Sequence, residues 1–212
     1  MLAEAAARRY NLVTVLTTYD PAMTLRDARA RYFAVNAFGN DGGYDEPWVD
    51  FKLGPLPVPF PNTAGRARAV GYHDLHHVLT DYDTDLFGEL EISAWEIAAG
   101  CRGYFAAWVI NFGAMGLGAV LRPGRTFRAF LRGRRMRTLY GREMEALLER
   151  TVGEVRREVE VADPRPAGIV DAALFGMAAV VGLATGTVSA TLMLPLVPVG
   201  LVTLARRRRK VG

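Results

Sequence analysis

Cysteine, lysine and histidine are all scarce in this chain of 212 residues. The one cysteine, Cys101, excludes an internal disulfide. Because it lies in an apolar stretch, we expect a buried, inert thiol in a protein of a reducing compartment. Lysine occurs only as Lys52 and Lys210, so arginine supplies nearly all of the positive charge. The net charge of +4 is modest, and its distribution along the chain is more informative than its size.

Several signals of common protein classes are also missing. The sequence has no Gly-x-Ser-x-Gly motif and no glycine-rich phosphate loop, which argues against serine-nucleophile and nucleotide chemistry. The first sixteen residues carry Glu4, Arg8 and Arg9 without a clean apolar run, so no secretory signal is expected. Strand-like alternation is weak throughout, and we therefore predict an all-α fold.

The pattern along the chain predicts two parts. We place a helical metal- and lipid-binding domain at residues 1–162 and a C-terminal membrane anchor at 163–212, because the composition changes sharply after a hinge at 163–166. A proline-rich strip at 40–61 favours extended, polyproline-like backbone. Capping signals at Thr24 and Thr151 mark two helix starts. Helices are predicted at about 2–17, 24–38, 63–79, 86–99, 102–121, 124–135 and 142–160.

All three histidines, His73, His76 and His77, fall within five positions. They form the pattern His73-Asp74-x-x-His77, which is followed by eleven residues and then Glu89. Residues four apart on a helix lie one turn apart on one face. Two imidazoles and the Asp74 carboxylate can then approach one divalent cation, and Glu89 on the next helix would add another oxygen ligand.

Other interpretations of the cluster are weaker. Zinc proteases have Glu where this chain has the shorter Asp74, phosphohydrolases with a His-Asp pair need a further histidine upstream, and a di-iron site needs two Glu-x-x-His motifs. A solvated cluster without a ligand is the remaining alternative. We expect His76 to support the site from outside or to lie on the surface. Glu91 and Glu96 compete with Glu89 as ligands, and a solvated helix face is expected for Glu91.

These residues resemble a known family. The stretch GYHDLHHVLTDYDTDLFGELEISAWE is similar to the signature of the Coq-four family of ubiquinone (coenzyme Q) biosynthesis proteins. The later stretch RAFLRGRRMRTLYGREMEALLERTVGEVRREVEV is similar to the basic segment that closes this family's sequences. The similarity covers roughly residues 62–161, and its His/Asp/Glu motif is the more specific part.

The resemblance implies a helical protein on the cytoplasmic face of an inner membrane, or on the matrix face in a mitochondrion. It implies a divalent metal, often taken as zinc, that is held by His73, Asp74, His77 and Glu89. Asp74 and Glu89 are then also the candidates for catalytic proton transfer. The resemblance further implies a groove for a polyprenylated aromatic lipid. Family proteins are linked to replacement of the ring's C1 carboxyl by hydroxyl, and to assembly of the other quinone-biosynthesis proteins.

Three functions stay open at this point. The first is a metal-dependent enzyme, such as an oxidative decarboxylase of a prenylated hydroxybenzoate. The second is a non-catalytic lipid-binding scaffold in which the metal braces two helices. The third and least favoured is a metal-dependent membrane hydrolase of lipids. A homo-oligomer is among the expected assemblies.

Residues 104–121 carry no charge. A buried core helix is the first interpretation, and a membrane span is less favoured because the neighbouring helices have soluble patterns. The small residues Gly113, Gly116 and Gly118 would also leave room for a lipid chain beside the helix. The side chains expected to line this room are Tyr104, Trp108, Phe112 and Met115.

Two segments indicate a membrane. Eight arginines between positions 122 and 142 have no acidic residue among them. A solvated helix and nucleic-acid binding are the alternatives, but we favour an anionic membrane surface and do not expect a nucleic-acid partner. The expected contacts are Arg128, Arg132, Arg134 and Arg135.

The second segment is a charge-free run at 172–205, which a basic run follows at 206–210. The run is longer than one span of about 20 residues and shorter than two. A single crossing would put the two basic segments on opposite sides, whereas basic segments stay cytoplasmic. We therefore predict a helical hairpin that turns near 185–189 or at Pro195.

Overall fold

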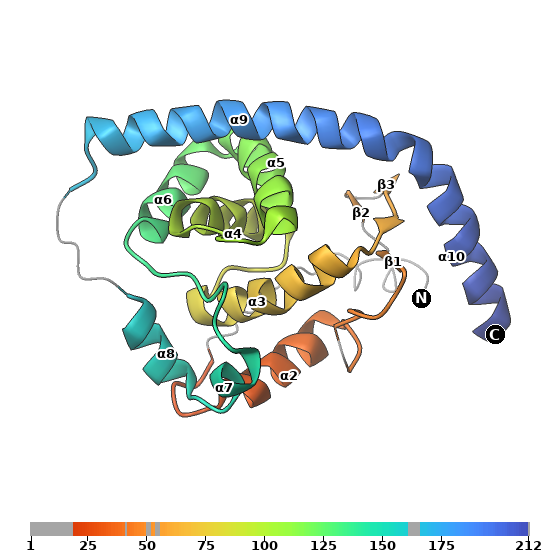
Figure 1. Ribbon diagram of the computed structural model, residues 1–212, viewed down its shortest axis with the longest axis horizontal. Helices are drawn as coiled ribbons and strands as arrows, with labels where there is room; N and C mark the ends of the chain where they lie inside the picture. Colours follow the sequence, from red (N-terminus) through yellow and green to blue (C-terminus); the bar gives the residue numbers. More distant parts are fainter. Residues whose placement is uncertain (1–18, 41, 50–51, 54–55, 161–165, 212) are drawn as a thin grey trace, which may run out of the picture.

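The structure of the chain, a computed structural model, describes residues 19–40, 42–49, 52–53, 56–160 and 166–211. Helices dominate this part of the chain, which confirms the all-α prediction (Figure 1). The predicted helix at 2–17 lies outside the described residues. The helices are α2 (Leu25–Asn36), α3 (Ala64–Thr80), α4 (Leu86–Ala99), α5 (Phe105–Leu121), α6 (Pro123–Gly133), α7 (Met144–Leu148), α8 (Val152–Val159), α9 (Ile169–Met193) and α10 (Val197–Val211), with a 3-10 turn η1 (Leu194–Leu196) before α10.

Side-chain caps fix where the helices begin. The Thr63 hydroxyl accepts a backbone N–H of α3 at 3.2 Å, and the Asp85 carboxylate accepts one of α4 at 2.7 Å. Such caps contribute about 1 kcal/mol each. The two caps predicted from the sequence are confirmed, because Thr24 begins α2 and Thr151 begins α8 in a full capping box with Glu154.

The centre of the domain is α4, which packs against α5 and α6 (Figure 1). The largest side chain of this core, Trp95, is fully buried. α6 approaches it so closely that a Cβ on Gly133 would lie 2.2 Å from the Trp95 carbonyl oxygen. Glycine is therefore required at this crossing, and α4 is held firmly by its neighbours.

The proline-rich strip forms two short antiparallel ladders where the sequence predicted a polyproline-like conformation. β1 (Trp48–Val49) pairs with β4 (Phe60–Pro61), and β2 (Lys52–Leu53) pairs with β3 (Leu56–Pro57). The Asn62 side chain donates to the carbonyls of Tyr44 and Glu46 at 2.9 and 2.8 Å. These bonds close the strip and bring Tyr44 toward α3.

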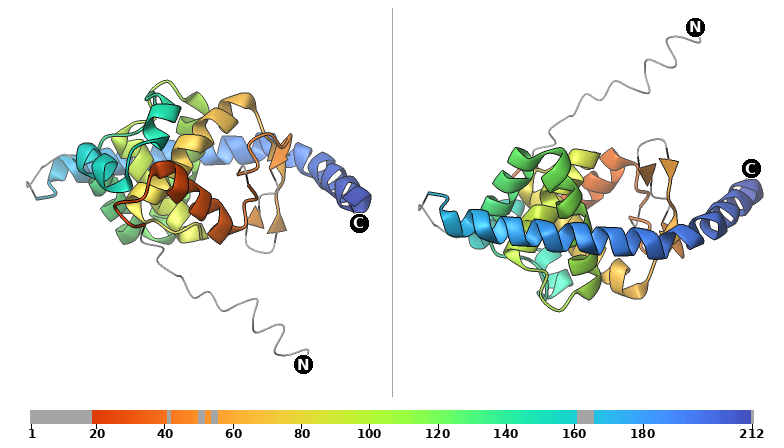
Figure 2. Two further views of the ribbon diagram at one scale, coloured as in Figure 1. Left: turned by 90° about the horizontal axis from the view of Figure 1, so that it is seen from below. Right: turned by 90° about the horizontal axis from the view of Figure 1, so that it is seen from above.

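The C-terminal segment is one long helix, so the predicted hairpin is wrong. α9 continues through η1 into α10 without folding back (Figures 1 and 2). Thr187 and Thr191 donate their hydroxyls to carbonyls one turn earlier, at 2.8 and 2.9 Å, and the backbone at 185–189 stays helical. Pro195 lies in η1, where the segment bends but does not reverse.

Glycines let α9 lie directly on α5. A Cβ on Gly116 would come within 2.4 Å of the α9 backbone, and one on Gly182 within 2.3 Å of an α5 carbonyl oxygen. Gly113 faces Gly186 in the same contact, and Gly118 packs against α4 and α6. The room predicted for a lipid chain at the three α5 glycines is therefore filled by helices, and that prediction is wrong.

Candidate metal centre

α3 presents His73 and His77 one turn apart on the same face. Their rings meet edge to face, with centroids 4.7 Å apart. The His77 ring also stacks on Tyr32 of α2, at 5.6 Å between centroids and 27° between planes. His77 is buried and His73 is partly exposed, so the pair opens toward solvent at one edge.

Glu89 reaches the two rings from the first turn of α4. The loop before α4 crosses this turn so closely that a Cβ on Gly88 would lie 2.0 Å from the Asp83 carbonyl oxygen. Only glycine permits this approach, which sets the direction of the first turn. The Glu89 side chain is 37% exposed, so the site reaches solvent on its side.

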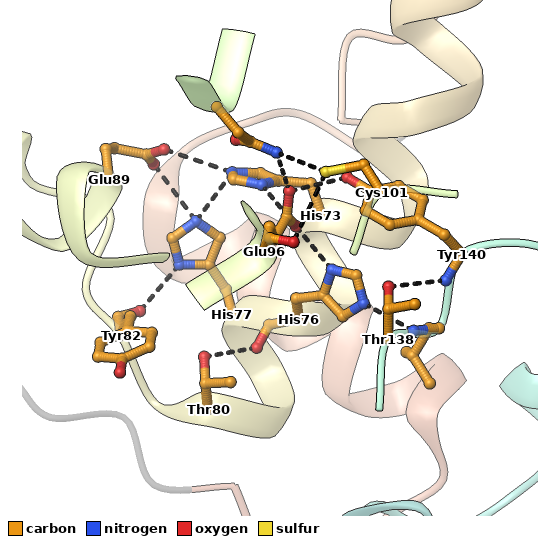
Figure 3. A network of polar contacts seen from close by, with 12 residues as sticks. His73, His76, His77, Thr80, Tyr82, Glu89, Glu96, Cys101, Thr138 and Tyr140 are labelled. Carbon is orange, nitrogen blue, oxygen red and sulfur yellow. Dashed lines mark hydrogen bonds and ion pairs between the residues drawn. The ribbon is translucent and has the colours of Figure 1, made fainter. Parts of the chain in front are cut away.

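The ligand atoms of these three residues converge (Figure 3). The Nε2 atoms of His73 and His77 lie 3.2 Å apart. Glu89 Oε2 lies 3.3 Å from His73 Nε2, and Glu89 Oε1 lies 3.4 Å from His77 Nε2. A tetrahedral cation about 2.0–2.1 Å from each ligand would separate the ligand atoms by about 3.3–3.4 Å. The two Nε2 atoms therefore have the spacing of two corners of a four-coordinate metal site, and the Glu89 carboxylate places one oxygen near each ring. Taken with one atom per residue, the ligand atoms all lie within 4.8 Å of one another.

Hydrogen bonds orient both rings toward this point. His77 Nδ1 donates to the Tyr82 carbonyl oxygen at 2.9 Å, and His73 Nδ1 donates to the Glu96 carboxylate at 3.0 Å. Both partners only accept, so in the neutral rings the protons lie on Nδ1 and the Nε2 lone pairs face the site. Partners of this kind commonly fix metal-binding histidines.

Glu96 is the buried carboxylate behind the site. One oxygen accepts from His73 and, at 2.6 Å, from His76 Nδ1. The other accepts from the Tyr140 hydroxyl at 2.8 Å and from the Asn111 amide. A fully buried charge needs this degree of hydrogen bonding, and Glu96 thereby connects α3, α4, α5 and the segment before α7.

His76 is fully buried, so the surface alternative for it is wrong. Its Nε2 accepts the Leu139 N–H at 3.0 Å, which leaves the ring proton on Nδ1 for Glu96. Burial lowers the pKa of His76. His76 is therefore a neutral donor that supports Glu96 from behind.

The electrostatics of the site favour a positive charge at its centre. Burial lowers the pKa of His73, but the carboxylates of Glu96 and Glu89 outweigh burial and hold this pKa well above 6.5. Burial raises the pKa of Glu89, but the imidazoles of His77 and His73 outweigh it and hold this pKa at about 2. With both rings neutral, the two carboxylates leave two negative charges, which one divalent cation would balance.

Asp74 lies beside the group of three and does not join it. Its carboxylate accepts a hydrogen bond from the Tyr44 hydroxyl, and burial raises the pKa of Asp74. The structure thus brings together three of the four predicted ligands and pairs the fourth, the buried Asp74, with the partly buried Tyr44. Glu91, expected on a solvated face, instead pairs with Arg125 at 3.0 Å.

Tyr44 and Arg66 were not predicted from the sequence. Arg66 lies seven residues before His73, on the same face of α3, and its charge interacts with the carboxylates of Asp74 and Glu89. That spacing was a usable signal for Arg66. Tyr44 comes from the proline-rich strip, whose path no local pattern predicts.

A small cavity of about 60 Å³ opens beside His77. Its lining includes Tyr19, Tyr32, Tyr82 and Asp83. This volume suits a few water molecules and is too small for an aromatic ring. A larger ligand would therefore approach from the exposed side of Glu89.

The four arginines predicted to meet a membrane have different environments. Arg134 pairs with Asp171 of α9 at 2.7 Å, and Arg132 donates to the Thr80 carbonyl at 2.6 Å, at the end of α3. Arg128 is exposed. All but Arg134 line an open hollow of about 630 Å³ between α6 and α8.

The predicted lipid-binding residues lie along α5. Met115 is fully buried in the core. Trp108 stacks on Phe112 at 5.6 Å, and the Tyr104 ring packs 4.9 Å from Tyr140. None of these four side chains lines either of the two cavities above. Tyr140, the partner of Tyr104, also donates to Glu96, so this aromatic pair borders the Glu96 network.

No family model, no curated protein and no solved structure matches this chain.

Proposed function

We propose that the chain is a membrane-associated, metal-dependent protein of ubiquinone-type quinone biosynthesis that acts on a polyprenylated aromatic acid. The observation that supports this proposal is the convergence of His73, His77 and Glu89, whose ligand atoms all lie within 4.8 Å of one another. The family resemblance marks these same positions as metal ligands. The proposed place is the cytoplasmic face of an inner membrane, or the matrix face in a mitochondrion, beside the other quinone-biosynthesis proteins.

The donor set fits zinc, which we propose as the metal. Two imidazoles and one carboxylate are a common catalytic zinc set, and they leave a fourth position for water or substrate. His73, His77 and Glu89 would hold the ion. When bound, it would supply Lewis-acid polarisation of the ring's carboxylate or phenolate.

Asp74 and Arg66 are the chain's own groups for handling the substrate. Because burial raises the pKa of Asp74, this carboxyl takes up a proton more readily than an exposed one. The Arg66 guanidinium, close enough to interact with the Asp74 and Glu89 charges, would orient the substrate's carboxylate. Replacement of a ring carboxyl by hydroxyl is a two-electron oxidation, so an external oxidant such as O₂ must take the electrons.

The chain also offers a membrane-associated surface. Residues Ile169–Thr203 are long and apolar enough to cross a membrane, by length and composition. The aromatic packing of Tyr104 against Tyr140 links α5, on which this helix lies, to the Glu96 network.

Metal content, co-purifying lipid and product formation test the proposal together. Glu89→Gln keeps the size of the side chain and removes its charge, and Glu91→Gln is a matched control on the same helix. We expect about one metal ion per chain and a prenylated aromatic lipid in the wild type and the control, and loss of metal and product in Glu89→Gln with an unchanged helical spectrum. Equal metal content in both variants would contradict the proposal.

A non-catalytic scaffold is the second candidate. The Glu96 network favours it, since this one carboxylate already ties α3, α4 and α5 together and a metal would reinforce the same junction. In a scaffold, Glu89→Gln would lower thermal stability and weaken capture of the partner proteins. In an enzyme, the same change would abolish product while the partners are retained.

A further inference from the structure

The helix α9–α10 has two apolar faces with different surroundings. Residues 172–205 carry no charge. Partly or fully buried residues recur at every third or fourth position from Asp171 to Gly200, so one continuous face lies on the protein. The opposite face has no protein cover among the described residues. Its large apolar residues are exposed, and six of those that are exposed by more than half are Val170, Met177, Val180, Val188, Leu192 and Leu194.

The inner face of α9, which is the face that lies on the protein, contacts the domain near the start of the helix. Asp171 forms an ion pair at 2.7 Å with Arg134, the residue directly after α6. One turn later, the Phe175 ring packs against Phe127 and Phe130 of α6, with centroids 5.1 and 5.6 Å apart. The first turns of α9 are therefore fixed to the arginine-rich helix of the domain.

The inner face also contacts the domain in the middle of α9 and further along, in α10. Gly182 and Gly186 lie against the α5 backbone, where a Cβ on Gly182 would lie 2.3 Å from a carbonyl oxygen. Further on, a Cβ on Gly200 of α10 would lie 2.7 Å from Pro59 and 2.9 Å from Trp48. The helix therefore lies along one face of the domain from Asp171 to Gly200, and the end of α10 extends beyond it (Figure 2, right).

These attachments decide how the helix can meet a bilayer. From Asp171 to Gly200 the helix spans about 44 Å at 1.5 Å per residue, whereas the hydrocarbon core is about 30 Å thick. If the helix crossed the bilayer, the domain fixed to both of its ends would be drawn into the hydrocarbon together with charged groups such as Arg134. A helix in the membrane plane keeps every attachment and buries its outer apolar face in lipid.

We propose that α9–α10 is an in-plane membrane anchor, which rests on the proposed membrane association and specifies its geometry. The occupant of the outer face is the acyl-chain region of one leaflet, about 5–10 Å deep. The basic run at 206–210 stays on the same side as the domain and contacts anionic headgroups. In this arrangement the bilayer thickness does not limit the length of the charge-free run, because the helix lies in the membrane plane.

Sidedness is tested with single cysteines in the full chain, since the native Cys101 is buried. Arg137→Cys marks the domain and Arg206→Cys marks the end of the helix, and both positions are exposed. In sealed vesicles containing anionic lipid, a membrane-impermeant maleimide added outside should label both variants equally. Labelling of only one of them would overturn the in-plane arrangement.

The depth of the helix in the bilayer gives an independent test of its orientation. Val170, Val181 and Leu192 are eleven residues apart, so their side chains share nearly one face of the helix. With a fluorophore on a cysteine at each position, quenching by lipids labelled at known depths should give three similar, shallow depths. A profile that is deep at 181 and shallow at both ends would show a crossing helix and contradict the proposal.

Vesicle flotation distinguishes a failure of membrane association from a failure of the in-plane geometry. Wild-type protein that fails to float with anionic vesicles would contradict membrane association itself. Protein that floats but labels from opposite sides would overturn only the in-plane geometry.

Discussion

His73 Nε2 and His77 Nε2 lie 3.2 Å apart while the Nδ1 atom of each ring donates to an acceptor elsewhere. In the neutral rings, two lone pairs therefore face each other across a short gap. This arrangement is repulsive unless a proton or a cation lies between them. The Glu89 carboxylate, 3.3 to 3.4 Å from both nitrogens, adds to the preference for positive charge.

Removing one imidazole should abolish tight metal binding. Structural zinc sites gain about 10–16 kcal/mol from about four ligands, so His77→Ala should weaken zinc affinity by at least about a hundredfold. Competition against a chromogenic chelator measures this affinity. The Glu91→Gln control should bind as the wild type does, and an unchanged affinity in His77→Ala would count against the site.

Glu96 should matter for metal binding without touching the metal. Glu96→Gln keeps the volume but weakens the acceptor that orients His73, and changes of this kind typically cost 10–100-fold in affinity. Tyr140→Phe removes only the hydroxyl that donates to the other oxygen of Glu96, so its affinity should change less. Equal affinities in both variants and the wild type would show that Glu96 does not position His73.

The pH dependence should have opposite signs with and without metal. In metal-free protein the raised pKa of His73 contributes stability below about 6.5, which is lost as the pH rises through the folded-state value. The lowered pKa of Glu89 contributes stability above about 4.5, which is lost as the pH falls toward about 2. Metal-free stability from this pair should thus be greatest between about pH 4.5 and 6.5.

Metal binding requires the rings to be deprotonated, so affinity should instead fall as the pH drops below the raised His73 value. The expected slope is about tenfold per pH unit for each proton displaced. Thermal unfolding measured with and without a chelator, from about pH 4.5 upward, follows the stability of the metal-free and the metal-bound protein. Parallel pH curves for the two forms would be inconsistent with metal at these residues.

The contact of α9 with α5 should tolerate no side chain at Gly182. Its Cβ would lie 2.3 Å from a carbonyl oxygen, so Gly182→Ala should destabilise by about 1–3 kcal/mol. Gly176, on the same helix, has nothing within 4 Å of its Cβ, and Gly176→Ala should be neutral or stabilising by up to about 1 kcal/mol. Thermal unfolding in mild detergent measures the difference, and equal effects would mean that the helices are apart.

Local signals predicted the helices that carry the site. The ends of α4 agree with the prediction at 86–99, because Asp85 and Gly100 act on the backbone next to them. His73 and His77 share one helix, so their spacing alone placed them together. Glu96 could be named only as a competing ligand, because its role depends on Tyr140 and other groups that meet it through the fold.

Two results depended on packing that no local pattern contains. Asp74 was predicted as a ligand, but Tyr44, from a strip without helical periodicity, meets its carboxylate instead. The hairpin prediction used the length of the charge-free run and the need to keep both basic segments on one side of the membrane. It could not include Gly116 and Gly182, which give the helix a protein face to lie on.

The most direct test of the central claim is X-ray absorption at the metal edge of zinc-loaded, full-length protein. We predict two imidazole ligands at about 2.0–2.1 Å with at least one oxygen ligand, and a spectrum that loses one imidazole in His77→Ala and is unchanged in Glu91→Gln. A wild-type spectrum without imidazole scattering, or one that His77→Ala leaves unaltered, would contradict a metal centre at His73, His77 and Glu89.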